Sequence, residues 1–387
     1  LGEREVPAER YYGIQTLRAL ENFSITGIPI SHYPRLLHSL AYIKKAAALA
    51  NMELGLLPVD IGGAMVTACD EILAGKLHSE FVVDVIQGGA GTSTNMNANE
   101  VIANRALELL GHEKGRYDLV HPLNHANLSQ STNDVYPTAL RLTLSIKLDG
   151  MLREMQTLRN ALAAKGAEFA SVIKMGRTQL QDAVPMTLGQ EFEAWGIMVE
   201  EDMARVREAQ ALIHEINMGA TAIGTGLNAH PAYAALVTER LAQVSGVPVI
   251  KAQNLVEATQ DAGAYVQLSG VLKRVAVKLS KISNDLRLLS SGPRAGLGEI
   301  NLPPMAPGSS IMPGKVNPII PEVVNQVAFE VIGNDLTVTM AAEAGQLELN
   351  AFEPVIAFNL FRSMDMLGRA CRTLAQRCIQ GITANRE

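Results

Sequence analysis

The stretch 265–289, YVQLSGVLKRVAVKLSKISNDLRLL, decides the fold of this chain. Its apolar residues recur in steps of three and four throughout, at Tyr265, Leu268, Leu272, Val275, Leu279, Ile282, Leu286 and Leu289. That spacing places them on one face of an α-helix, as in a coiled coil or an antiparallel bundle. At 1.5 Å per residue, a helix of about 30 residues is roughly 45 Å long. Such a helix needs partners along its length, so the pattern predicts a bundle completed by oligomerisation.

Further helical patterns surround this stretch. Residues 142–169 are expected to form a long helix that the segment 130–138 opens, and residues 186–218 another that begins after Pro185. Nearer the N-terminus, two helical patterns lie between residues 36 and 73. The order of these patterns predicts a mixed, mostly helical N-terminal domain at 1–133 and a long-helix bundle domain at 134–387.

Composition agrees with a mainly α fold. The chain has 387 residues, with 48% hydrophobic and 4% aromatic residues. This length exceeds the roughly 250–300 residues at which one core stops growing, and few aromatics suit packed helices better than a β-sandwich. The net charge of −6 gives a nucleic-acid partner no electrostatic basis. Cys69, Cys371 and Cys378 share no metal or redox spacing, so reduced thiols and a cytoplasmic location are expected.

The segment 308–318, GSSIMPGKVNP, is the densest polar motif of the chain, and we call it the serine loop. It combines two hydroxyls, a cation and a carboxamide with glycines and prolines that exclude a helix. A helix is expected over 323–344, with Asn317 as its N-cap and Pro318 at its first position. A loop of this kind before a helix N-terminus can hold an anion. The alternative is a surface loop with a capping asparagine.

Two other polar segments precede helical patterns. Segment 87–100, QGGAGTSTNMNANE, predicts a glycine turn whose hydroxyl residues at 92–94 cap a helix over 101–110. By itself such a segment is usually just a cap. In the segment 130–138, QSTNDVYPT, the residues Ser131, Thr132 and Asn133 stand before a helix start. A cap explains one of these three polar residues and leaves two for another role.

Metal and membrane sites are not expected. His121 and His125 are four residues apart, but Pro122 denies them a shared helical face, and the sequence offers no carboxylate or cysteine to complete a shell. No run of about 18 apolar residues is present, so no membrane-spanning segment is predicted from the sequence.

These segments, together with 9–18 and 174–190, resemble the fumarase/aspartase superfamily over essentially the whole chain. The resemblance implies long central helices that form a bundle across a homotetramer, with each site built from loops of three subunits. It implies a lyase that removes a proton and a leaving group from a succinyl-type dicarboxylate to give fumarate, without an organic cofactor. Relatives carry a further small C-terminal helical domain that is absent from this chain, so we interpret the sequence as a core fragment.

Site residues follow from matching each motif to the superfamily. The resemblance makes Ser309 the base that removes the proton, while Lys315 and Asn317 fix a carboxylate. It implies substrate binding by Thr92, Ser131, Thr132, Asn133, Thr178, Gln179 and Ser310. The chain departs from the pattern after Pro122, where relatives usually have Asn-Asp and this chain has Leu123-Asn124. Any secondary anion site that relatives use there is therefore in question.

Gln179 favours one leaving group. Expulsion of hydroxide from malate needs a general acid, whereas the ammonium group of aspartate leaves as ammonia that already carries its protons. A carboxamide cannot act as that acid, although it can hydrogen-bond an amino group. The sequence therefore predicts deamination of L-aspartate through Cβ proton abstraction and an aci-carboxylate intermediate. Fumarate hydratase is the first alternative, and a non-catalytic structural protein that keeps the fold is the second.

Overall fold

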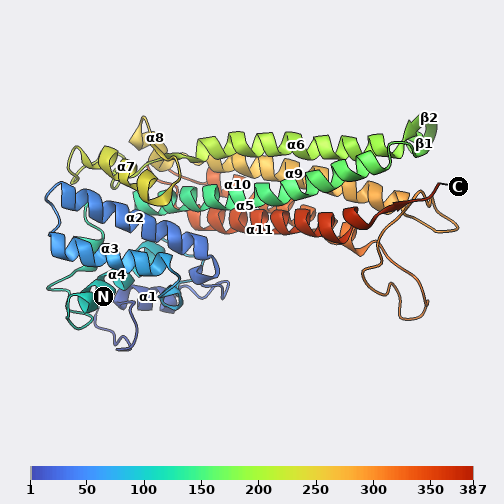
Figure 1. Cartoon of the computed structure of the whole chain (residues 1–387). Helices are drawn as coiled ribbons and strands as arrows, with labels where there is room; N and C mark the ends of the chain where they lie inside the picture. The colour runs from blue at the N-terminus through green and yellow to red at the C-terminus, as the bar shows by residue number, and fades with distance from the viewer. Residues whose placement is uncertain (1, 387) are drawn as a thin grey trace. The chain divides into compact units, whose positions relative to one another are not determined.

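The computed structural model describes residues 2–386, and helices make up most of them (Figure 1). The α-helices are α1 (Ile14–Asn22), α2 (Pro34–Glu53), α3 (Val59–Leu73), α4 (Thr92–Leu109), α5 (Thr132–Glu168), α6 (Leu188–Ile213), α7 (Tyr233–Ser245), α8 (Leu255–Gln260), α9 (Gly263–Leu289), α10 (Ile319–Glu343) and α11 (Glu353–Arg377). Short 3-10 helices are η1 (Ile30–His32), η2 (His78–Glu80) and η4 (Ile379–Gly381), and η3 (Pro122–Ala126) is a π-helix.

The strands form three small two-stranded sheets. Their members are β1 (Ile173–Thr178), β2 (Gln181–Thr187), β3 (Glu215–Ile216), β4 (Ile250–Lys251), β5 (Ile300–Asn301) and β6 (Thr383–Ala384). β1 and β2 form an antiparallel hairpin, β3 pairs with β4 in parallel, and β5 pairs with β6 antiparallel. The mainly α class predicted from the sequence is confirmed.

The chain folds into two compact units, each made of several separate segments. Unit 1 comprises residues up to 146, residues 210–266 and residues 337–359; unit 2 comprises residues 147–209, 267–336 and 360 onward. By residue number, α5, α6, α9, α10 and α11 each contain residues assigned to both units. The domain boundary expected at 133/134 stays a prediction. The two units are each made of several separate segments, so they do not test a single boundary in the sequence.

Unit 1 is built around packed helices, with α2 in contact with both α3 and α7, and α3 with α4. The buried carboxylate of Glu100 on α4 fixes the start of α1. It accepts hydrogen bonds from the backbone N–H groups of Gly13 (2.8 Å), Gln15 (2.8 Å) and Thr16 (3.1 Å). Those N–H groups have no partner within their own helix, so a carboxylate from another element satisfies them and interacts favourably with the helix dipole.

Unit 2 is a bundle of long helices that run side by side (Figure 1). The periodic residues of α9 are all buried, with at most 5% of the surface of each exposed, which confirms the helix predicted from their spacing. Ion pairs join neighbouring helices at their edges. Arg274 on α9 pairs with Asp202 on α6 at 2.7 Å, and Lys147 on α5 pairs with Asp365 on α11 at 2.5 Å.

Three predicted helix boundaries were wrong. α6 begins at Leu188 and ends at Ile213 instead of covering 186–218, because Pro185 lies in β2, opposite Met175. α4 begins at Thr92 and not at residue 101, since its asparagines, weak helix formers, are held in buried hydrogen bonds. α10 begins at Ile319, after Pro318, and the side-chain amide of Asn317 donates to the carbonyl of Gly308 instead of capping the helix.

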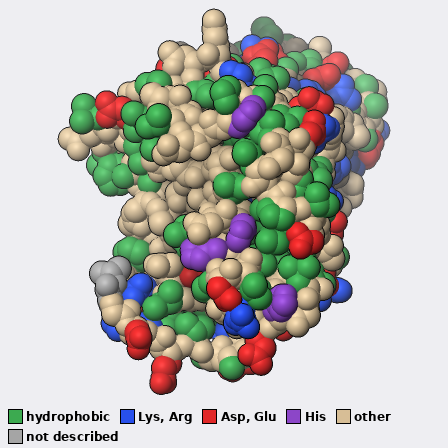
Figure 2. All heavy atoms as spheres, turned by 90° about the vertical axis from the view of Figure 1, so that its left-hand side faces the viewer, with side chains coloured by type: hydrophobic (Ala, Val, Ile, Leu, Met, Phe, Trp, Pro, Cys, Tyr) green, Lys and Arg blue, Asp and Glu red, His purple; other side chains and the backbone are tan. Residues whose placement is uncertain are grey.

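The surface is mixed in charge on the face drawn in Figure 2, where acidic, basic and apolar side chains are interspersed. Within residues 2–386, none of the helices combines the length and the apolar character needed to cross a bilayer.

Candidate active site

The predicted site residues are divided between the two units. Unit 1 carries Thr92 and the segment 131–133, and unit 2 carries Thr178, Gln179 and the serine loop. Each group is described by itself below. Thr92, Thr132 and Asn133 stand in the first turns of α4 and α5, Thr178 is the last residue of β1, and the serine loop lies in the long connection between β5 and α10.

The segment 131–133 is fixed by the buried carboxylate of Asp134. This carboxylate accepts hydrogen bonds from the backbone N–H groups of Ser131 (3.0 Å), Gly219 (3.2 Å) and Thr221 (3.0 Å). It thereby joins the start of α5 to the segment 219–221. Burial removes water from the carboxylate, which raises the pKa of Asp134 to about 7, while the three N–H donors pull the pKa down.

The three predicted side chains of this segment make different contacts. The Oγ of Ser131 accepts from the backbone N–H of Asn133 at 3.1 Å. Thr132 Oγ1 accepts from the side-chain amide of Asn95 at 3.0 Å. The amide nitrogen of Asn133 donates to the carbonyl of Ala222 at 2.7 Å, so the amide oxygen of Asn133 is the atom left to accept from a ligand.

A cavity of about 620 Å³ opens beside Ser131 in unit 1. It is lined by two segments, 127–131 and 221–223, together with Leu123, Asn124, Thr225, Leu227 and Asn228. Thr221 has a positive φ of 59°, an uncommon conformation for a β-branched residue that Asp134 helps to hold through the backbone N–H. A cavity of this volume lies in the range of small-molecule sites.

Thr92 is the first residue of α4 and is exposed, with its hydroxyl donating to the carbonyl of Gly89 at 2.7 Å. It is not a lining residue of the cavity beside Ser131. Asn95, one turn further along α4, bonds Thr132, so the same helix that begins at Thr92 also supports the segment 131–133.

A buried polar network beneath this segment was missed from the sequence. The Oδ1 of Asn127 accepts from the side chains of Lys44, Asn95 and Asn99, each at 3.1 Å. Lys44 also donates to the side-chain oxygen of Gln130 at 2.8 Å, and its burial lowers the pKa of this ammonium group to about 7. A signal was present, because Lys44 falls on the apolar stripe of α2, at i+4 and i+7 from Leu40 and Leu37.

The two histidines considered as metal ligands make local hydrogen bonds instead. His125 Nδ1 accepts from the backbone N–H of His121 at 2.8 Å, and His121 Nδ1 accepts from that of Leu123 at 3.0 Å. These bonds shape the π-helix η3, which follows His121 directly.

Thr178 and Gln179 lie at the turn of the β1–β2 hairpin in unit 2. Thr178 pairs with Gln181, and the two residues between them, Gln179 and Leu180, have positive φ values of 54° and 64°. This backbone is that of a tight two-residue hairpin turn. The side chains of residues 178–180 are all exposed on the chain.

The serine loop holds its own shape through short-range hydrogen bonds. The backbone N–H of Gly308 donates to the carbonyl of Lys315 at 2.8 Å, and the side chain of Asn317 donates to the carbonyl of Gly308 at 2.7 Å. Ser309, half-buried, accepts at Oγ from the N–H groups of Ile311 (3.2 Å) and Met312 (3.1 Å). Two N–H donors aimed at one hydroxyl oxygen favour its deprotonated form. Ser310 and Lys315 are exposed.

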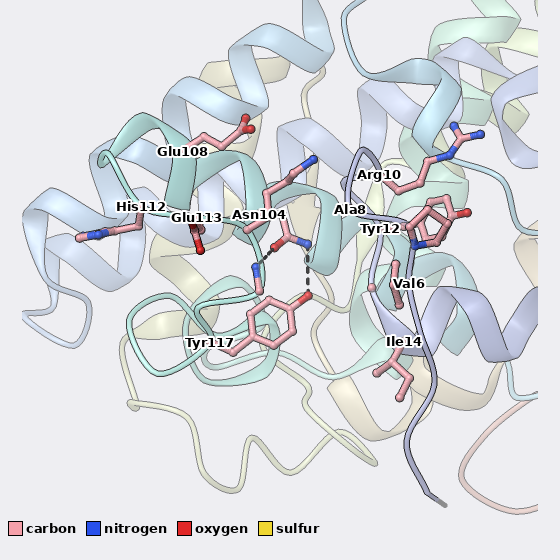
Figure 3. A pocket seen from close by; sticks show the side chains of 14 residues that line it. Val6, Ala8, Arg10, Tyr12, Ile14, Asn104, Glu108, His112, Glu113 and Tyr117 are labelled. Atoms are coloured by element: carbon pink, nitrogen blue, oxygen red, sulfur yellow. Dashed lines mark hydrogen bonds between the residues drawn. The ribbon is translucent and has the colours of Figure 1, made fainter.

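A second cavity in unit 1, of about 710 Å³, lies away from these residues (Figure 3). It is bounded by residues 6–14 and by the end of α4 with the loop after it, and Asn104 crosses it to bond Tyr117 (3.1 Å) and Gly115 (2.8 Å). The side chains of Glu108, His112 and Glu113 lie on one side of Asn104 and those of Arg10 and Tyr12 on the other. None of the predicted site residues contributes to its described lining.

Comparison with known proteins adds to this picture. A family model described as lyase matches residues 2–333. The aspartate ammonia-lyase of Helicobacter pylori is 61% identical over 385 residues, which cover 100% of this chain and 82% of the relative. A crystal structure of a fumarate lyase:delta crystallin from Brucella melitensis, bound to cobalt, matches with a TM-score of 0.98 and 61% identity, covering 100% of this chain and 84% of that one. A class II fumarase from Schistosoma mansoni matches with a TM-score of 0.95 but 39% identity, covering 98% of this chain and 83% of the other.

Proposed function

This chain belongs to the lyase family of the fumarase/aspartase superfamily, and we propose that it deaminates L-aspartate to fumarate and ammonia. The observation that carries this proposal is the 61% identity, along the whole chain, with an aspartate ammonia-lyase. Identity with the class II fumarase is much lower, at 39%, although the fold is shared. The substrate class is therefore a four-carbon amino dicarboxylate.

Ser309 is the proposed base. Its alkoxide removes one proton from Cβ of aspartate, and the electron pair moves into the adjacent carboxylate to give the doubly charged aci-carboxylate. That pair then forms the Cα–Cβ double bond while the Cα–N bond breaks and ammonia leaves. A serine is a weak base unless its alkoxide is stabilised. The hydrogen bonds from Ile311 and Met312 to Ser309 Oγ support this role, because they point at the oxygen that must carry the charge.

The aci-carboxylate needs preorganised donors, each typically worth about 3–4 kcal/mol of transition-state stabilisation. Neutral hydroxyl and amide groups suit this task because they stabilise the negative charge by hydrogen bonding without transferring a proton to it. We assign it to Thr92, Ser131, Thr132, Thr178 and Ser310. Lys315 and Asn317 are assigned to the other carboxylate, where a fixed positive charge strengthens the hydrogen bonds.

The amino group is assigned to Asn133 and Gln179. One N–H of the Asn133 amide donates to Ala222, and the amide oxygen can accept from an ammonium group. Gln179 can hydrogen-bond an amino group but cannot protonate a departing hydroxide. The lack of a proton donor at Gln179 favours ammonia over water as the leaving group.

A homotetramer with shared sites is the proposed assembly. The described surface of α10 supports it, because Phe329 (63% exposed), Ile332 (39%) and Leu336 (62%) form an apolar stripe along one face of the helix. Exposed apolar residues at this spacing are typical of a helix that packs against another copy. The segment 131–133 and the serine loop of different subunits would then line the same site. A cytoplasmic location stays part of the proposal.

The test measures fumarate absorbance with L-aspartate and with malate as separate substrates. We expect kcat/KM for aspartate to exceed that for malate by at least about 100-fold, which corresponds to roughly 2.7 kcal/mol. A preference for malate would instead establish the hydratase alternative, and turnover of neither substrate would favour a non-catalytic protein. Ser309→Ala is expected to abolish turnover while a succinate analogue still binds, whereas Ser171→Ala, at an exposed position in the same unit, leaves the rate unchanged.

A further inference from the structure

Glu299 occupies a rigidly held position between α9 and β5. Its backbone N–H donates to the carbonyl of Leu289, the last residue of α9, at 2.9 Å. Its own carbonyl accepts from the N–H of Asn385 at 2.9 Å, next to the pairing of β5 with β6. The backbone of Glu299 is therefore anchored from both sides.

The side chain of Glu299 reaches the β1–β2 hairpin and pairs with two of its cations. Arg177 Nη1 lies 2.5 Å from Oε1, and Lys174 Nζ lies 3.2 Å from Oε2. Lys174 also pairs with Glu191 in the first turn of α6. The exposed fractions of the Lys174, Arg177 and Glu299 side chains are 8%, 21% and 18%, so water screens these pairs less than it screens exposed ones.

The geometry of β1 makes it unusual that Lys174 and Arg177 pair with the same carboxylate. Side chains three residues apart on a regular strand point to opposite faces, so Lys174 and Arg177 would diverge. The register between β1 and β2 shifts between Met175 and Arg177. Such an irregularity adds local twist, and both cations reach the same carboxylate.

Arg177 immediately precedes Thr178 and Gln179 at the hairpin turn. An isolated two-stranded hairpin is marginally stable in water. The location of the turn therefore depends on contacts that fix its strands. Within unit 2, the ion pairs of Glu299 hold β1 at the residue next to the turn and again three residues earlier.

We propose that Glu299 is a positioning residue, which sets the location of Thr178 and Gln179 through Arg177 and Lys174. This inference rests on the proposed function for its catalytic consequence. Misplacement of substrate-contacting groups by about 1 Å can reduce turnover roughly 100-fold. Loss of these two ion pairs therefore lowers the rate of deamination, although Glu299 itself touches no reacting atom.

The first test is independent of activity. Hydrogen exchange is measured on the full chain for the wild type, Glu299→Gln and the control Glu200→Gln, which removes an exposed ion pair with Arg159 in the same unit. In Glu299→Gln, the amides of residues 173–187 are expected to exchange at least about 10-fold faster, with α5 and α6 unchanged. The control leaves the hairpin unchanged. Unaltered hairpin exchange in Glu299→Gln overturns the proposal.

The second test is a kinetic double-mutant cycle with L-aspartate. Glu299→Gln is expected to lower kcat/KM about 10- to 100-fold. In a Gln179→Ala background, the same change costs less, because one of the two groups being positioned is gone. In a Ser310→Ala background, by contrast, Glu299→Gln is expected to lower kcat/KM by the same factor as in the wild type. Full multiplication with Gln179→Ala overturns the proposal, whereas an inactive wild type refutes the proposed function and leaves hydrogen exchange to decide the positioning role.

Discussion

The side-chain amide of Asn317 donates a hydrogen bond to the carbonyl of Gly308 at 2.7 Å, nine residues earlier in the chain. A second bond, from the N–H of Gly308 to the carbonyl of Lys315, runs beside it at 2.8 Å. Together they tie the two ends of the serine loop, which therefore presents Ser309 from a closed ring of backbone. Loss of either hydrogen bond would therefore loosen the whole serine loop, and not just the two residues that form that bond.

Asn317→Ala is expected to lower kcat/KM for L-aspartate by about 10- to 100-fold. The variant removes the side-chain tie at the base of the loop and the proposed carboxylate contact together. Fumarate absorbance measures the rate. Asn160→Ala, at an exposed position of α5, is the matched control and leaves the rate unchanged. An Asn317→Ala enzyme with the wild-type rate would contradict both proposed roles of this residue.

Gly91→Ala is expected to lower the free energy of unfolding by about 2–4 kcal/mol. Gly91 precedes α4 with a φ of +90°, and an added Cβ would lie 2.2 Å from the ring of Tyr136. The left-handed conformation costs a non-glycine residue about 1–2 kcal/mol, and overpacking adds a further cost of about 1–3 kcal/mol. Urea unfolding measures the change. Gly63→Ala, in α3 with open space around it, should be neutral or stabilising.

Glu353→Gln is expected to change how stability depends on pH. The carboxyl group is buried, with Oε2 unpaired among the described residues, and this burial raises the pKa of Glu353 from 4.5 to about 8, against the opposing pull of Arg141. As the pH rises from about 4.5 to about 8, the unfolded chain loses this proton while the folded chain retains it. Folding stability therefore falls across that window, by an amount on the order of a few kcal/mol.

In Glu353→Gln that decline disappears, and the variant becomes more stable than the wild type at pH 8. Thermal unfolding between pH 4.5 and 8 measures the difference between the two proteins. Glu208→Gln, at an exposed position of α6, should reproduce the wild-type profile. Parallel profiles for the wild type and Glu353→Gln would show that this carboxyl titrates at its usual pH in the folded chain.

Leu336→Lys is expected to disrupt the proposed tetramer. The substitution places a charge within the apolar stripe of α10, where a copy of the chain would bury it at a cost of several kcal/mol. Light scattering after size exclusion measures the mass, and activity should fall with it because the sites are shared. Gln156→Lys, exposed on α5, retains the tetramer. A fully active Leu336→Lys monomer would exclude shared sites.

The sequence predicted the helical class and the core of the bundle correctly because both depend on periodicity. The eight residues of the α9 stripe are buried as expected, and a spacing of three and four has few other outcomes. Boundaries were predicted less well. The start of α4 was missed because Asn95 and Asn99 are held by Asn127, which is distant in sequence. The start of α6 was missed because Pro185, a typical helix opener, lies instead in a hairpin strand.

The candidate site shows the same division. Motif resemblance suggested residues whose contacts are local, such as Ser309, whose Oγ accepts from the N–H groups of Ile311 and Met312, and their roles stay a prediction. The supporting charges could not be found in this way. Asp134 acts on the segment 219–221 and Glu299 on the hairpin, and both pairings appear once distant segments pack together. The one such signal in the sequence is a charged residue placed on the apolar stripe of a helix, as at Lys44, which indicates a buried polar network.

The left-handed backbone at Gln179 has a consequence for how this enzyme family can diversify. Few side chains tolerate a φ of 54°, and histidine is among the more tolerant. An imidazole could therefore replace the carboxamide without rebuilding the turn. A lineage could then exchange an amide for a proton-donating group at the point predicted to face the departing amine. The turn therefore accommodates either a carboxamide or an imidazole at residue 179.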